Sequence, residues 1–146
     1  MVADLSGLST RTGTLERIWL LRMQASLEEA GAIVDKVMEA DPLAYGRYER
    51  NVFVSATGTE SYRPLANSTT ALHKADDGNI QAVPCVELVI SIAQDRDRLA
   101  LVLDAIHDAH HYEEPVIYVQ DTWASRANYD PNNTNTNRWW NRKAGP

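Results

Sequence analysis

Cysteine is nearly absent from this sequence. Cys85 is the single cysteine among 146 residues. One thiol excludes an internal disulfide and any Cys-x-x-Cys metal or redox site. Because Cys85 lies inside an apolar run, we expect it to be a small core residue rather than a nucleophile.

Basic residues are in the minority, with 14 Lys and Arg against 20 Asp and Glu. The net charge of −6 argues against a nucleic-acid partner, because such proteins gather basic side chains on one face to contact phosphates. No apolar run approaches the roughly 20 residues that cross a bilayer, and the N-terminus lacks a basic and apolar signal segment. We therefore predict a cytoplasmic protein with no nucleic-acid and no membrane partner.

The common catalytic and nucleotide-binding motifs are missing as well. The sequence contains no G-x-G-x-x-G, G-x-x-x-x-G-K-[ST], G-x-S-x-G or H-E-x-x-H. These patterns mark dinucleotide and phosphate sites, activated serines and zinc proteases. Nucleotide binding and covalent catalysis therefore have no motif support.

The pattern of apolar residues predicts one α+β domain. Apolar side chains alternate over 85–93, as in a strand, and recur every three or four residues over 27–38, as in an amphipathic helix. The order strand, helix, strand, strand, helix, strand is that of a ferredoxin-like sandwich, in which two helices cover one face of an antiparallel sheet. The predicted strands are 18–23, 45–57, 85–93 and 115–122, the predicted helices are 26–41 and 95–111, and 58–82 is a polar loop.

Two flanking segments fall outside this domain, which we place at 15–123. Residues 1–14 show no sustained period and are predicted to be a flexible leader. Residues 124–146 are rich in asparagine and include Trp139 and Trp140. Because paired tryptophans rarely stay in solvent, we expect this tail to be strapped across the sheet or a neighbouring subunit. The alternative is a peptide that docks on a partner protein.

Four side chains with metal-ligating chemistry lie on the second predicted helix. They occupy positions i, i+3, i+4 and i+7, which a helix projects from one face. Two histidines four residues apart can chelate Zn²⁺ or Cu²⁺, and nearby carboxylates can complete the ligand set. The alternative is an ordinary solvated helix face. The residues are Asp104, His107, Asp108 and His111.

The residues that end this helix form a second candidate. His110 falls on the apolar stripe, so we expect it to point toward the core or an interface and to need a partner for each ring nitrogen. Tyr112 and Glu114 share its face if the chain is extended, whereas Glu113 points the other way. A catalytic pair of Glu113 and Glu114 is therefore disfavoured.

A third candidate surrounds Arg63. An arginine in a segment rich in hydroxyl groups and backbone amides can hold a carboxylate or a phosphate. The alternative is that Arg63 pairs with Glu87 or another acid and has a structural role. The neighbours that would complete a ligand site are Tyr62, Asn67, Ser68 and Thr69.

Two blocks of residues form a recognisable pattern. The first block is Gly46-x-Tyr48, then Phe53, then Gly58-Thr59-x-x-Tyr62-Arg63-Pro64-Leu65-x-Asn67. The second block is His110-x-Tyr112-Glu113-Glu114-Pro115, followed by Tyr118. They resemble G-x-Y, F, G-T-G-x-F-R-P-L, N and H-P-Y-E-E-P-A-Y in the domain inserted in YqfO-like members of the Nif-three family. That domain is itself similar to the trimeric PII and CutA proteins, and the resemblance covers roughly residues 16–122.

Three differences limit what the resemblance implies. His111 replaces the usual proline, Glu60 replaces the second glycine of G-T-G, and the halves that carry a two-metal site in full-length members are absent from the matched residues. The resemblance therefore implies a fold and a trimer rather than a reaction. It also implies that His110, Tyr112 and Glu114 line a cleft where subunits meet.

These observations lead to three functional hypotheses. The first is a PII/CutA-like homotrimer that binds a divalent metal ion or a small anion in inter-subunit clefts lined by 110–114 and 58–70. The second is a small metal-dependent enzyme, hydrolytic or lyase, that uses the histidines, Tyr112 and the glutamates. The third is a structural or interaction module whose tail docks elsewhere.

Overall fold

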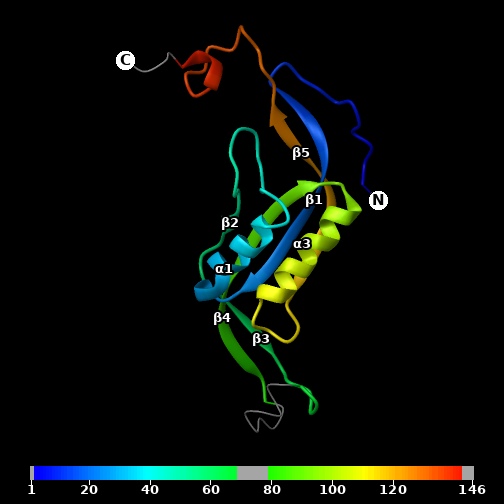
Figure 1. Ribbon diagram of the computed structural model, residues 1–146, viewed down its shortest axis with the longest axis vertical. Helices are drawn as coiled ribbons and strands as arrows, with labels where there is room; N and C mark the ends of the chain where they lie inside the picture. The colour runs from blue at the N-terminus through cyan, green and yellow to red at the C-terminus, as the bar shows by residue number, and fades with distance from the viewer. Residues whose placement is uncertain (1, 69–78, 143–146) are drawn as a thin grey trace.

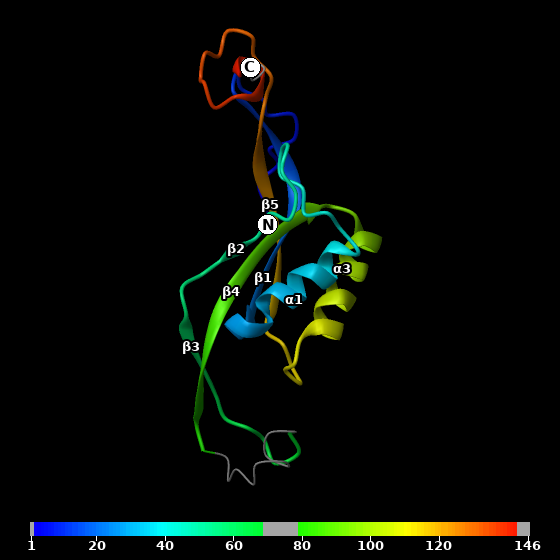
Figure 2. The ribbon, with the colours of Figure 1, turned by 60° about the vertical axis from the view of Figure 1, so that its left-hand side comes forward.

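An antiparallel sheet and two helices form the described part of the chain, residues 2–68 and 79–142, in this computed structural model (Figure 1). Both helices lie on one side of the sheet, as Figure 2 shows. No helix within these ranges is long and apolar enough to cross a membrane. The elements are β1 (Gly13–Ala25), α1 (Leu27–Met38), β2 (Phe53–Val54), β3 (Gly58–Tyr62), β4 (Gln81–Ala93), α3 (Arg96–Ala109), β5 (Ile117–Ala127) and a short 3-10 helix at Trp139–Asn141.

The strands follow the order β2-β4-β1-β5, and β3 pairs with the remaining part of β4. All of these pairs are antiparallel. β1 and β4 form the centre, and β5 lies at one edge. Because β2 and β3 together take the place of one strand, the order is the predicted strand, helix, strand, strand, helix, strand.

The core lies between the sheet and the helices. Alternate residues of β1 and β4, such as Leu21 and Leu88, point toward the helices. α1 begins with a capping box at Ser26 and contributes Ile33, while α3 contributes Ile106. The four apolar side chains are fully buried, and such burial stabilises the fold by about 1.5–3 kcal/mol for each one.

The central strands are longer than the apolar pattern predicts. β1 begins at Gly13, inside the predicted leader, and β5 ends at Ala127, inside the predicted tail. The two strands pair continuously from Gly13–Ala127 to Met23–Ile117. Their outer ends, 13–17 and 123–127, show no apolar alternation, so only the backbone ladder with the partner strand defines them.

The predicted strand at 45–57 is mostly wrong. Only Phe53–Val54 pairs with β4 as β2. Upstream, Tyr45 and Tyr48 exchange backbone hydrogen bonds of 2.8 and 3.1 Å and close a tight turn. Gly46 takes a φ of 59° in that turn, a conformation that glycine adopts without steric cost.

The predicted loop at 58–82 is also wrong at both ends. It begins with β3, and its last two residues belong to β4. Residues 69–78 of this segment lie outside the described part of the chain. β3 was not predicted because its residues are mostly polar. It is a strand because its backbone pairs with that of β4.

A bulge separates β2 from β3. Phe53 pairs with Val89 and Gly58 pairs with Cys85, so the segment 53–58 has one residue more than the segment 85–89 that it faces on β4. The extra residue lies near Ser55, whose hydroxyl accepts a hydrogen bond from the Glu87 N–H at 2.7 Å. Bulges bend and twist the strand that carries them. The β3–β4 hairpin accordingly runs past the helices (Figure 1).

The described part of the tail, up to residue 142, folds on itself beyond the end of β5 and does not cross the sheet of its own chain (Figure 1). Tyr129, Trp139 and Trp140 form a ring cluster with centroids 5.2–6.0 Å apart. The Trp140 indole N–H donates to the carbonyl of Asn133 at 3.3 Å. A strap across a neighbouring subunit stays a prediction.

Candidate ligand-binding site

A buried carboxylate, Glu29, connects the start of α1 to the end of α3. Its oxygens accept the backbone N–H of Ser26 at 3.3 Å and that of His111 at 3.1 Å. The His111 ring Nδ1 also lies 3.1 Å from it. Glu29 was not among the predicted site residues. The signal that could have revealed it is the Ser-x-x-Glu spacing of a capping box.

His110 is buried and both of its ring nitrogens have partners. Nε2 lies 2.6 Å from the Gln24 carbonyl, and Nδ1 accepts the backbone N–H of Tyr112 at 3.2 Å. Because a carbonyl oxygen can only accept, Nε2 is the donor to Gln24. The prediction that His110 points inward with both nitrogens satisfied is confirmed.

Tyr112 packs against His110, with ring centroids 4.6 Å apart. Burial, and then the charges of Glu60 and Glu29, raise the pKa of the Tyr112 phenol. Burial, followed by the charge of Glu60, also raises the pKa of the Cys85 thiol. Both groups therefore stay protonated at neutral pH, and neither is activated as a nucleophile.

Glu60, Tyr62 and Cys85, on the β3–β4 hairpin, lie near enough to Tyr112 to raise the pKa of its phenol. The hairpin pairs Gly58 with Cys85 and Glu60 with Val83, so these three side chains share one face. One carboxylate oxygen of Glu60, Oε2, is buried without a hydrogen-bond partner. We call Glu29, Glu60, Tyr62, Cys85, His110 and Tyr112 the Tyr112 cluster.

We expect the Tyr112 phenol to ionise above its ordinary pKa of 10.0, because burial and nearby carboxylates disfavour the phenolate. An absorbance titration should show this late phenolate, and Tyr112→Phe should remove it. Glu60→Gln should lower the pKa of Tyr112. Because the folded pKa is the higher one, the contribution of Tyr112 to stability is present below pH 10.0 and is lost as pH rises through the folded pKa.

The matched control is Tyr48→Phe, which removes an exposed phenol outside the proposed seam and should leave the late phenolate in place. A titration in which Tyr112→Phe and Tyr48→Phe remove the same component would contradict the assignment.

The predicted metal set does not assemble. α3 ends at Ala109 because His110 takes an extended ψ of 134°. His111 therefore leaves the helical face and turns to Glu29, whereas Asp104, His107 and Asp108 stay exposed on α3. Across residues 2–68 and 79–142, no three His, Cys, Asp or Glu side chains are grouped to hold a metal ion.

The structure does not bring the other predicted ligand residues together at one site. Tyr62 joins the Tyr112 cluster, whereas Arg63, Asn67 and Glu114 are exposed. The suggested pairing of Arg63 with Glu87 is wrong, since Glu87 pairs with Arg22 at 3.1 Å. Thr69 lies outside the described residues.

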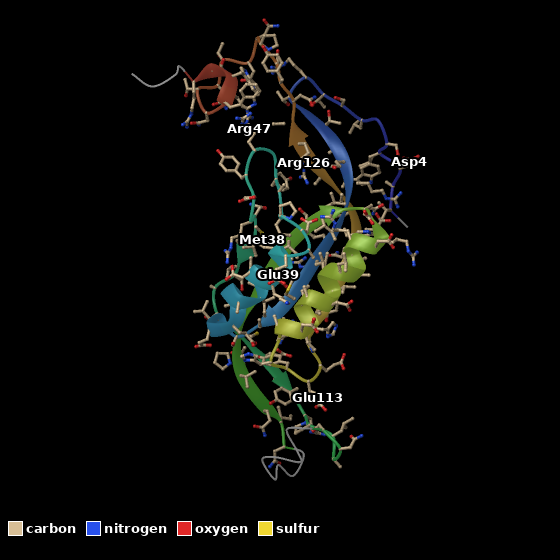
Figure 3. All side chains as sticks on the ribbon, in the orientation of Figure 1. Asp4, Met38, Glu39, Arg47, Glu113 and Arg126 are labelled. Carbon is tan, nitrogen blue, oxygen red and sulfur yellow. The ribbon has the colours of Figure 1, made fainter. Side chains whose placement is uncertain are left out.

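The chain after α3 bends instead of extending. Residues 112–114 form bends, and β5 begins only at Ile117. Figure 3 places Glu113 in this bend, beside the β3–β4 hairpin. The predicted alternation of faces from His110 to Glu114 therefore does not hold.

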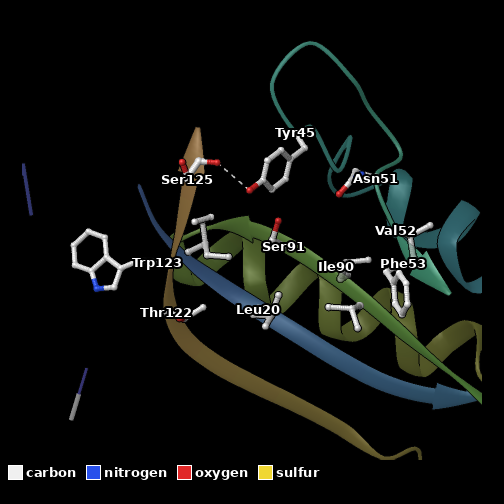
Figure 4. A pocket seen from close by; sticks show the side chains of 13 residues that line it. Leu20, Tyr45, Asn51, Val52, Phe53, Ile90, Ser91, Thr122, Trp123 and Ser125 are labelled. Carbon is white, nitrogen blue, oxygen red and sulfur yellow. Dashed lines mark hydrogen bonds between the residues drawn. The ribbon is translucent and has the colours of Figure 1, made fainter. Parts of the chain in front are cut away.

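The side of the sheet away from the helices carries a groove of about 590 Å³ (Figure 4). Leu20, Val89 and Thr122 form its floor, and Phe53 lies at its side. The Tyr45 hydroxyl donates to the Ser125 carbonyl at 3.0 Å and encloses one end. This groove was not predicted, because its lining comes from four segments.

The sequence matches no protein-family profile and no curated protein. Solved structures do match. A Bacillus cereus protein related to NIF3 aligns with a TM-score of 0.58 and 20% identity over 77% of this chain and 28% of that one. This chain thus spans under a third of that protein.

Two CutA structures align over more of their own length. The divalent ion tolerance protein CutA1 of Ehrlichia chaffeensis has a TM-score of 0.52 and 17% identity over 73% of this chain and 81% of its own. CutA from Synechococcus elongatus has a TM-score of 0.51 and 18% identity over 74% of this chain and 81% of its own. The chain therefore has the α+β, ferredoxin-like fold of the PII/CutA-like proteins.

Proposed function

We propose that this chain is a cytoplasmic, PII/CutA-like homotrimer that binds a divalent metal ion or a small anion at clefts between subunits. Residues 110–114, with the Tyr112 cluster, and the 58–70 segment would line each cleft. Its role is binding or regulation rather than covalent catalysis, which accords with the raised pKa values of Tyr112 and Cys85.

The observation that carries this proposal is the uncovered face of the sheet. The helices cover one face, whereas Phe53 and Tyr118 are 64% and 58% exposed. Their strand pairings, Phe53 with Val89 and Tyr118 with Arg22, place both on the face away from the helices. An apolar face of this kind needs cover, and further copies of the same sheet would supply it.

The ligand classes follow from the exposed side chains. Arg63 suits a carboxylate or a phosphate, and His107 and His111 suit a transition metal. Because one chain does not group three metal ligands within the described ranges, a metal site would draw on more than one copy. A substitution that prevents trimer formation should therefore also abolish ligand binding at the cleft.

The test combines particle mass with calorimetry. Light scattering should give about 49 kDa, three times 16.3 kDa. Tyr118→Asp places a charge in the proposed seam and should give single chains that no longer bind Zn²⁺, Cu²⁺ or orthophosphate at the cleft. Arg63→Gln should keep the trimer and weaken orthophosphate binding alone.

The matched control is Leu101→Asp. Leu101 is 57% exposed but lies on α3, away from the open sheet face. This variant should remain a trimer with unchanged binding. A wild-type protein that is monomeric at micromolar concentration would refute the proposal.

A further inference from the structure

Arginine side chains gather around a second hollow, far from the Tyr112 cluster. It has a volume of about 550 Å³ and lies between the 45–48 turn, the end of β5 and residues 137–142. Figure 3 labels Arg47 on the turn and Arg126 on β5. The arginines that line it are Arg47, Arg126, Arg138 and Arg142.

Aromatic rings hold two of these guanidinium groups in place. The Arg47 Cζ lies 4.7 Å from the centroid of the Trp139 ring, and the Arg126 Cζ lies 3.7 Å from that of Tyr45. Stacking of this kind fixes the guanidinium plane while leaving its edge N–H groups available. Trp139 of the tail and Arg47 of the turn thus contact each other at the edge of the hollow.

The positive charge in this hollow is poorly compensated. Arg126 pairs with Glu16, whose carboxylate lies 3.1 Å from its Nε. Among the described residues, no carboxylate forms an ion pair with Arg47, Arg138 or Arg142, and no acidic side chain lines the hollow. A chain of net charge −6 therefore concentrates positive charge at one small site.

Two guanidinium nitrogens at this site are buried without a hydrogen-bond partner. They are Nη1 of Arg126 and Nε of Arg138. A buried donor without a partner costs about 1–3 kcal/mol, and more when it is charged. Because both nitrogens are covered by protein, an anion in the hollow would balance the charge of these guanidinium groups through their other N–H groups.

We propose that this hollow binds a small polyanion that carries two or more phosphate or carboxylate groups. Four arginines and one paired glutamate leave a charge that a single carboxylate would not balance. Planar guanidinium groups bind both carboxylates and phosphates in a bidentate manner. The volume suits a small molecule and is too small for a duplex nucleic acid.

Calorimetry on the full chain at low ionic strength tests this site, with pyrophosphate and citrate as probes. One equivalent per chain should bind. Arg47→Gln and Arg138→Gln should each weaken binding by about tenfold or more, the loss expected for one charge-assisted contact. Preference for pyrophosphate would identify a phosphate ligand, and preference for citrate a carboxylate ligand.

Arg50→Gln is the charge-matched control, because Arg50 follows the same turn but pairs with Asp35 at 2.8 Å. It should bind like the wild type. Arg63→Gln, which tests the inter-subunit cleft, should also leave this binding unchanged, so the two proposals can fail separately. Arg47 is exposed, so Arg47→Gln should fold normally. It therefore still tests the site if Arg138→Gln fails to fold. Absence of binding to both probes, or wild-type affinity in Arg47→Gln, would overturn the proposal.

Discussion

Replacing Glu29 with alanine should lower the free energy of unfolding by about 3 kcal/mol, because two backbone N–H groups lose a charged acceptor. Those groups belong to Ser26 and His111. The side chain of Glu29 is only 4% exposed, so water cannot easily replace it. Urea denaturation followed by circular dichroism measures the loss.

Two companion variants sharpen this test. Glu28→Ala removes an exposed carboxylate from the same first turn and should change stability by less than about 0.5 kcal/mol. Glu29→Gln keeps the shape of the side chain and one acceptor oxygen, so its loss in the free energy of unfolding should lie between those of Glu28→Ala and Glu29→Ala. If Glu29→Ala and Glu28→Ala have equal stability, Glu29 does not connect the two helices.

Ile106→Ala should cost about 2–5 kcal/mol, because it leaves a cavity under the last turn of α3. Ile106 is fully buried, and its carbonyl accepts the N–H of His110 at 2.9 Å. Collapse of the surrounding structure would also move His110 and Tyr112. Thermal and urea unfolding give the loss, and the late phenolate of Tyr112 should shift toward its ordinary pKa.

Leu101→Ala on the same helix is the control. Leu101 is 57% exposed, so its truncation should cost only a few tenths of a kcal/mol. An Ile106→Ala protein as stable as Leu101→Ala would mean that α3 does not pack on the sheet as described.

The element order was predictable wherever an apolar side chain recurs with a regular period. The alternation around Leu88 and the helical spacing around Ile33 reflect burial against one face. β3 and the outer ends of β1 and β5 were missed, because backbone pairing and not side-chain polarity defines them. The turn at Gly46 was predicted to be part of a strand, because the flanking Tyr45 and Tyr48 are residues that favour strands.

The candidate site was predictable only in part. His110 is buried, as its place on the apolar stripe predicts, and Tyr112 and Tyr62 lie near it. The metal set failed because α3 ends two residues before His111. Spacing along a helix predicts a shared face only while the helix continues.

The sequence by itself determined the secondary-structure order and the buried faces of both helices, because those depend on local periodicity. Only the tertiary structure decided which polar groups meet. Glu29, Glu60 and Tyr112 come from three separate segments, and Arg47 and Arg138 from two more. Strand register, the bulge near Ser55 and the fold of the tail set those distances, and each depends on contacts between residues far apart in the chain.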